Sequence, residues 1–203
     1  MAPRFALGLL LCLVGATAFA GTVHAGQPAG PANEHVESPS PDGTFAFLTS
    51  YGEDLHTIDL IEKKSGKKLQ RIDEEDSSQA SWNVLWASDL NRFALMTRLG
   101  HPIQGVDVYV RTGDTFRKVE LPDLPEANIP EKLKHGRKFP HVAGLNWQDA
   151  EAWKKDGSLV VTVTTMIDGD GPSITATRTV VLGFDRDGKA RIRTSTIKYE
   201  IGE

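Results

Sequence analysis

Short apolar stretches that alternate with polar positions recur along the chain, and turns rich in glycine and aspartate close them. Segment 106–110 (VDVYV) alternates strictly, and segment 192–197 (IRTSTI) is rich in β-branched residues. A period of two residues is typical of strands that bury one face. Asp-Gly and Ser-Gly pairs supply the positive φ that tight hairpin turns need. We therefore predict a fold that consists mainly of antiparallel strands.

One arrangement of turn, strand and hairpin occurs three times, in units that cover 36–75, 80–121 and 147–200. Asp42 and Gly66 are 24 residues apart, and Asp89 and Gly113 have the same separation. In the third unit the separation between the corresponding aspartate and glycine is 32 residues, and a glycine-rich turn accounts for the excess. Repeated offsets indicate a repeated supersecondary unit that buries its apolar face against its neighbours. Each unit opens with a turn aspartate: Asp42, Asp89 and Asp156.

The patterns predict three strands in each unit and an all-β class for the chain. The segment from residue 35 to residue 203 is long enough to form one hydrophobic core, so we expect a single domain. We expect three blade-like antiparallel sheets, arranged as a partial propeller or as a sandwich. The predicted strands are 45–49, 55–61, 68–72, 92–97, 106–110, 116–121, 159–164, 174–182 and 190–199.

Segment 122–146 interrupts the repeats and contains four of the eleven prolines. Asn128 as the N-cap, Pro130 in the first turn and Gly136 just past the last turn predict a short helix. An open stack of sheets leaves strand edges exposed, and folded proteins normally cover such edges. Our hypothesis is that this insertion covers one end of the stack.

The first 25 residues have the features of a cleavable signal peptide. Arg4 precedes the apolar stretch 5–14, which is too short to cross a bilayer, and small residues offer cleavage after Ala20 or Ala25. We expect a flexible tether over 26–34 and a periplasmic or secreted protein. The single cysteine, Cys12, lies in the signal, which excludes disulfides and thiolate metal sites from the mature chain.

The charge and motif content argue against several functions. With 23 Lys and Arg residues against 27 Asp and Glu, the net charge is −4, which disfavours nucleic-acid binding. The chain has no nucleophile elbow, phosphate loop, dinucleotide fingerprint or zinc-type histidine pair. We therefore expect no cofactor and no metal, and no transmembrane segment.

Two segments carry a resemblance to a known repeat. Segment 38–47 (SPSPDGTFAF) resembles the Ser-Pro-Asp-Gly signature of PD40 repeats, the blade units of TolB-like β-propellers. Segment 86–95 (WASDLNRFAL) is similar to a variant of that signature, and 153–157 (WKKDG) keeps its Trp, Asp and Gly. The resemblance implies blades of four antiparallel strands that serve mainly as binding scaffolds, and it implies no catalytic residue. Three units are fewer than the four to eight blades of a closed propeller.

Four tryptophans precede the turns that open the second and third units. Such rings pack between sheets, and an aromatic ligand platform is the alternative. We favour packing for all four: Trp82, Trp86, Trp147 and Trp153.

The insertion carries the best candidate site, because it concentrates basic residues on an otherwise acidic chain. Long insertions in compact domains tend to be functional. We predict a non-enzymatic module that binds an anion or a partner protein there, or that self-associates through sheet edges. The alternative is a hydrolase or other enzyme that uses loop carboxylates and His101; it requires a buried acid–histidine pair in a cleft. The predicted site residues are Lys132, Lys134, His135, Arg137, Lys138 and His141, with His101 and Trp147 as weaker neighbours.

Overall fold

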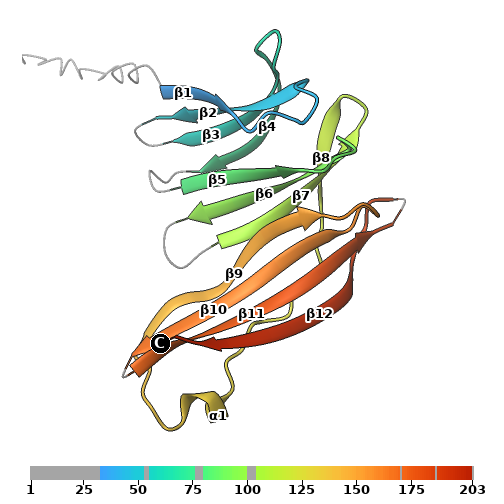
Figure 1. Cartoon of the computed structure of the whole chain (residues 1–203). Coiled ribbons are helices and arrows are strands. Elements are labelled where there is room, and N and C mark those ends of the chain that lie inside the picture. The colour runs from blue at the N-terminus through green and yellow to red at the C-terminus, as the bar shows by residue number, and fades with distance from the viewer. Residues whose placement is uncertain are drawn as a thin grey trace, which may run out of the picture.

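The computed structural model describes residues 33–52, 55–75, 80–99, 104–169, 171–185 and 187–202. Within these residues, strands form three four-stranded antiparallel sheets, in the orders β1-β2-β3-β4, β5-β6-β7-β8 and β12-β11-β10-β9. The sheets stack in chain order, with the second between the other two (Figure 1). The predicted all-β class with three antiparallel sheets is confirmed. The signal peptide (1–25) and most of the predicted tether lie outside the described residues.

Each sheet uses one continuous segment of the chain. The first consists of β1 (Asn33–Glu37), β2 (Phe45–Tyr51), β3 (His56–Glu62) and β4 (Lys67–Glu75). The second consists of β5 (Ala80–Trp86), β6 (Arg92–Leu99), β7 (Gln104–Thr112) and β8 (Thr115–Val119). After α1 (Glu131–Lys134), the third consists of β9 (His141–Trp153), β10 (Leu159–Gly169), β11 (Gly171–Phe184) and β12 (Ala190–Ile201).

The second sheet buries both of its faces. Phe93 and Leu95 of β6 pack with side chains of the first sheet, including Phe47. Their neighbours Ala94 and Met96 point the other way and pack with side chains of the third sheet. Successive side chains of β6 point to opposite faces of the sheet and therefore belong to two different hydrophobic clusters.

The three repeated aspartates form one type of corner. Each stands three residues before the second strand of its sheet, and its carboxylate accepts a hydrogen bond from the backbone N–H two residues later. The donors are Thr44, Asn91 and Ser158, at 3.0, 3.0 and 3.1 Å. The prediction that these aspartates are equivalent turn residues is confirmed.

The first strand of each sheet lies outside the strands predicted from the pattern. β1 begins at Asn33, so the predicted tether 26–34 is wrong for its last two residues. The side chains of β1 are mostly exposed, and the strand forms because its backbone pairs with β2. The predicted insertion 122–146 likewise extends too far, because β9 begins at His141.

The predicted short helix is present as α1, with a different start. Pro130 occupies the N-cap position, and Asn128 lies before it, so the assignment of Asn128 as the cap is wrong. Proline fixes φ and is compatible with a helix start, which explains the shift. Gly136 follows the left-handed C-cap residue His135, whose φ is 51°.

The insertion packs on the inner face of the third sheet instead of covering an open end of the stack. Ala127 is fully buried in the core between the second and third sheets, and Arg178 of β11 donates a hydrogen bond to the Glu126 carbonyl at 2.8 Å. The strands of the third sheet have 11 to 14 residues, whereas those of the second have 5 to 9. The second sheet therefore leaves part of that inner face uncovered, and the insertion covers it. Leu124 and Ile129 of the insertion supply apolar contacts to the core.

In the described part of the chain, no helix is long and apolar enough to cross a membrane.

Candidate functional site

The basic residues of the insertion gather at the end of the third sheet that extends beyond the second. Five of them lie in α1 and the loop after it, and His141 opens β9 opposite Asp168 of β10. Figure 1 shows α1 at this end of the molecule. We call the following six residues the basic tip: Lys132, Lys134, His135, Arg137, Lys138 and His141.

Two members of the basic tip hold the loop in place. The Lys134 ammonium lies 2.6 Å from a carboxylate oxygen of Glu131. The Arg137 Nε donates to the Lys134 carbonyl at 3.3 Å, and its guanidinium carbon lies 5.4 Å from the centre of the Phe139 ring. The other four members, Lys132, His135, Lys138 and His141, are exposed.

The loop also fits closely against the end of β10. A Cβ added at Gly169 would lie 2.8 Å from the Phe139 Cα and closer still to the Lys138 carbonyl oxygen. Only a residue without a side chain permits this approach of two backbones. The loop that carries the exposed basic side chains is therefore held close to the sheet at Lys138 and Phe139.

Exposed apolar side chains lie at the same end of the third sheet as the basic tip. Val142 and Leu145 of β9 are 53% and 56% exposed, and Ile201 at the end of β12 is 48% exposed. Acidic side chains are also near, because Asp168 faces His141 and Glu200 precedes Ile201. This end of the third sheet thus carries exposed basic, apolar and acidic side chains.

The two weaker site predictions have different outcomes. His101 lies outside the described residues. Trp147 lies six residues after His141 on β9, which is about 20 Å along a strand, so the structure does not bring it to the basic tip. Its ring packs on Gly144, where an added Cβ would come within 2.8 Å of the indole carbons.

The other three tryptophans pack between sheets, as predicted. Trp82 and Trp86 pack against the cluster between the first and second sheets. Trp153 packs against the other cluster, and its Nε1 donates to the Leu85 carbonyl of the second sheet at 2.9 Å.

A polar pocket that the sequence did not indicate lies between the second and third sheets. It has a volume of about 220 Å³. Arg98 and Gln104, which are partners across β6 and β7, lie next to Asp149 of β9. Their positions in the sequence are too far apart for any local motif to connect them. The lining includes Ser81, Asn83, Met96, Arg98, Gln104 and Asp149.

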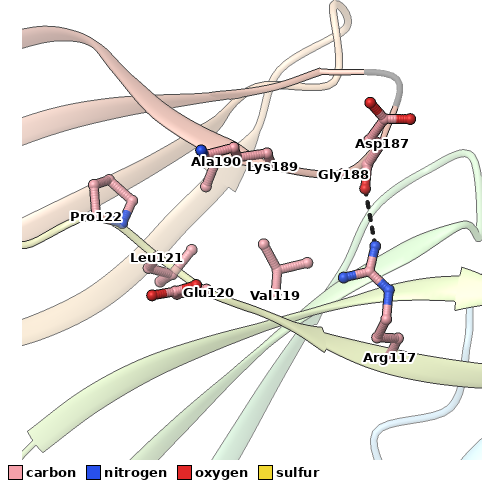
Figure 2. Close-up of a pocket in the computed structure, with 9 residues that line it drawn as sticks. All are labelled: Arg117, Val119, Glu120, Leu121, Pro122, Asp187, Gly188, Lys189 and Ala190. Atoms are coloured by element: carbon pink, nitrogen blue, oxygen red, sulfur yellow. Dashed lines mark hydrogen bonds between the residues drawn. The ribbon is translucent and has the colours of Figure 1, made fainter.

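A larger groove of about 400 Å³ lies where the outer part of the second sheet meets the turn before β12 (Figure 2). The Arg117 guanidinium crosses it and donates to the Asp187 carbonyl at 3.0 Å. Four of the nine lining residues are charged: Arg117, Glu120, Asp187 and Lys189. The groove therefore lies between two sheets and has a lining of charged and apolar residues.

The enzyme alternative requires an acid–histidine pair. None of the ion pairs among the described residues includes a histidine. The buried His56 packs against Tyr51 and Trp82, with ring centres 4.9 and 6.1 Å away.

Comparison of the chain with protein-family models, with curated proteins and with solved structures finds no match. The fold and the site define the class by themselves: an all-β protein of three stacked antiparallel sheets, with a basic insertion fixed to the third.

Proposed function

We propose that this chain is an exported, non-enzymatic binding module that engages an acidic partner protein through the basic tip. The observation that carries the proposal is the set of four exposed basic side chains on a loop whose backbone is fixed against Gly169. The scaffold is built from PD40-like repeats. The signal-like segment 1–25 supports export.

The composition of the surface supports a protein partner. Protein interfaces combine an apolar centre with a polar rim, and complementary charge speeds association. At this end of the third sheet, Val142 and Leu145 are exposed next to His141. The chain as a whole has a net charge of −4, so a local basic surface orients an acidic partner toward it.

The arrangement of the scaffold supports the same function. Binding residues are commonly placed on loops that a rigid framework positions. Gly169 lets this loop pack closely against a sheet whose inner face is part of the main core. The exposed lysines are therefore available for contact and contribute little to stability.

The test removes the two exposed lysines of the basic tip. Poly-L-glutamate serves as the acidic polypeptide probe, and its binding to the immobilised chain is measured at low and at physiological salt. The double variant Lys132→Ala/Lys138→Ala should bind several-fold more weakly, because each exposed charge contact is worth ~0.2–1 kcal/mol. Its melting temperature should stay within about 1 °C of that of the unmodified chain, given the small effect of surface substitutions.

A matched control replaces Lys154 and Lys155, two exposed lysines at the opposite end of the same sheet. Lys154→Ala/Lys155→Ala should leave binding unchanged. Equal weakening by both pairs would show that binding depends on total charge, and the proposal would then fail. Stronger binding to phosphatidylglycerol vesicles than to poly-L-glutamate would replace the protein partner with a membrane surface.

A further inference from the structure

The polar pocket between the second and third sheets contains a connected row of polar groups. Arg98 Nε donates to Gln104 Oε1 at 3.0 Å, and Gln104 Nε2 donates to Asp149 Oδ1. Gln104 is only 8% exposed, and both of its polar atoms are used. The buried Gln104 amide therefore lies between the Arg98 guanidinium and the Asp149 carboxylate and forms a hydrogen bond with each.

Arg98 and Asp149, at the two ends of this row, can each form further hydrogen bonds with a ligand. The terminal N–H groups of Arg98 and the Asp149 Oδ2 form no hydrogen bond with the residues that the structure describes. Asn83 and Ser81 add an amide and a hydroxyl to the same lining, and their register places them on the face of the sheet that carries Arg98. The pocket thus offers donors at one end and an acceptor at the other.

The electrostatics favour a ligand with two opposite charges. Burial raises the pKa of Asp149, and the charge of Glu151 adds to this effect, while the Arg98 charge and the Gln104 hydrogen bond oppose it. A ligand ammonium beside Asp149 would offset the desolvation of the carboxylate. The free fork of a guanidinium matches a carboxylate group.

We propose that this pocket binds a small zwitterion of the size of a free α-amino acid, with its carboxylate at Arg98 and its ammonium at Asp149. The pocket is small, with a volume of about 220 Å³, and therefore suits a compact molecule. Met96 supplies an apolar surface for a small side chain.

Other small polar ligands fit the pocket less well. A sugar would satisfy hydrogen bonds but would leave the desolvated Asp149 carboxylate without a counter-charge. An inorganic anion would pair with Arg98 and meet repulsion from Asp149. The pocket is built by β5, β6, β7 and β9, so ligand binding here does not depend on the basic tip.

Calorimetric titration with L-alanine and L-serine tests the proposal. At least one of them should bind, and propionate, ethylamine and D-glucose should each bind at least tenfold more weakly than it does. Asp149→Asn keeps an acceptor for Gln104 and removes the charge, so it should weaken amino-acid binding at least tenfold while the melting temperature stays nearly unchanged. Lys132→Ala/Lys138→Ala should leave the titration unchanged, which separates this site from the basic tip.

Glu200→Gln is the control, because Glu200 is an exposed carboxylate on β12 that does not line the pocket. It should change the affinity by less than twofold. Absence of binding by both amino acids at millimolar concentration would overturn the proposal. So would equal binding of D-glucose, or unchanged binding by the Asp149→Asn variant.

Discussion

The corner aspartates show how single residues stabilise the repeated turn. Hydrogen bonds from the Ser40 hydroxyl and then from the Thr44 hydroxyl hold the pKa of Asp42 at about 2. In the third sheet, hydrogen bonds from the Ser158 hydroxyl and backbone N–H hold the pKa of Asp156 at about 2. In both corners the folded state prefers the ionised carboxylate.

This preference predicts a loss of stability in acid. An aspartate has an ordinary pKa of 3.8, and both groups titrate near 2 in the folded chain. The folded state therefore gains stability from them above about pH 4, and it loses that contribution as the pH falls toward 2. The urea midpoint of the unmodified chain should fall steadily over this range.

The double variant Asp42→Asn/Asp156→Asn tests the assignment. It should be less stable than the unmodified chain at pH 7, and its urea midpoint should fall less between pH 4 and pH 2. Asp114→Asn, in an exposed turn without these hydrogen bonds, should preserve the full decrease. A decrease of equal size in the double variant would contradict the account.

Leu90 is an exception within the repeated corner. The residue after the aspartate is Gly43 in the first sheet and Gly157 in the third, with φ of 73° and 76°, and Leu90 has φ of 59° in the second. A side chain in this left-handed region costs ~1–2 kcal/mol. Leu90→Gly should therefore stabilise the chain by about 1 kcal/mol, after the greater freedom of glycine in the unfolded state is deducted.

Two further variants separate strain from side-chain contacts in thermal unfolding. The melting temperature of Leu90→Asn should lie between those of the unmodified chain and Leu90→Gly, because asparagine tolerates the left-handed region better than other side chains. Leu90→Ala loses the side chain and keeps the strain, so it should not be more stable than the unmodified chain. Equal stabilisation by alanine and glycine would remove backbone strain as the cause.

At the scale of elements, the sequence predicts the second, third and fourth strands of each sheet and misses the first. The later strands include clear patterns of alternation, as in β7. β1 has mostly exposed side chains, and register shifts interrupt the alternation of β9. These strands depend on backbone pairing with a neighbour, which a local pattern does not contain.

The two candidate sites differ in the same way. The basic tip is a run of neighbouring residues, so its composition identifies it before the fold is known. The polar pocket joins Arg98, Gln104 and Asp149 from three strands. Only the packing of the third sheet against the second brings them together.

The insertion gives a prediction at this scale. Gly169→Ala would drive a methyl group into the backbone of Lys138 and Phe139, which must then move. We expect a loss of ~1–3 kcal/mol, typical of an overpacked site. Amide exchange should become faster over 131–140 and stay unchanged in the second sheet.

Gly105→Ala is the control, because an added Cβ there meets no atom within 4 Å. Its amide exchange over 131–140 should match that of the unmodified chain. Unchanged exchange in Gly169→Ala would show that this glycine does not fix the loop.

At the scale of the whole molecule, the second sheet connects two hydrophobic clusters. Phe93 belongs to one cluster and Ala94, the next residue, belongs to the other. If either outer sheet unfolds, one apolar face of the central sheet becomes exposed to water. The architecture therefore couples three similar repeats into one folding unit.

This coupling predicts a single unfolding transition. Phe47→Ala in the first sheet should cost ~3–5 kcal/mol and Leu159→Ala in the third ~2–5 kcal/mol, because both side chains are fully buried. In urea, tryptophan fluorescence and far-UV circular dichroism should report the same midpoint for each variant. Val36→Ala, at a side chain that is 57% exposed, should change stability by no more than ~0.5 kcal/mol. If fluorescence and circular dichroism instead give different midpoints for Leu159→Ala, the third sheet unfolds alone. The central sheet would then not couple the unfolding of the third sheet to that of the first.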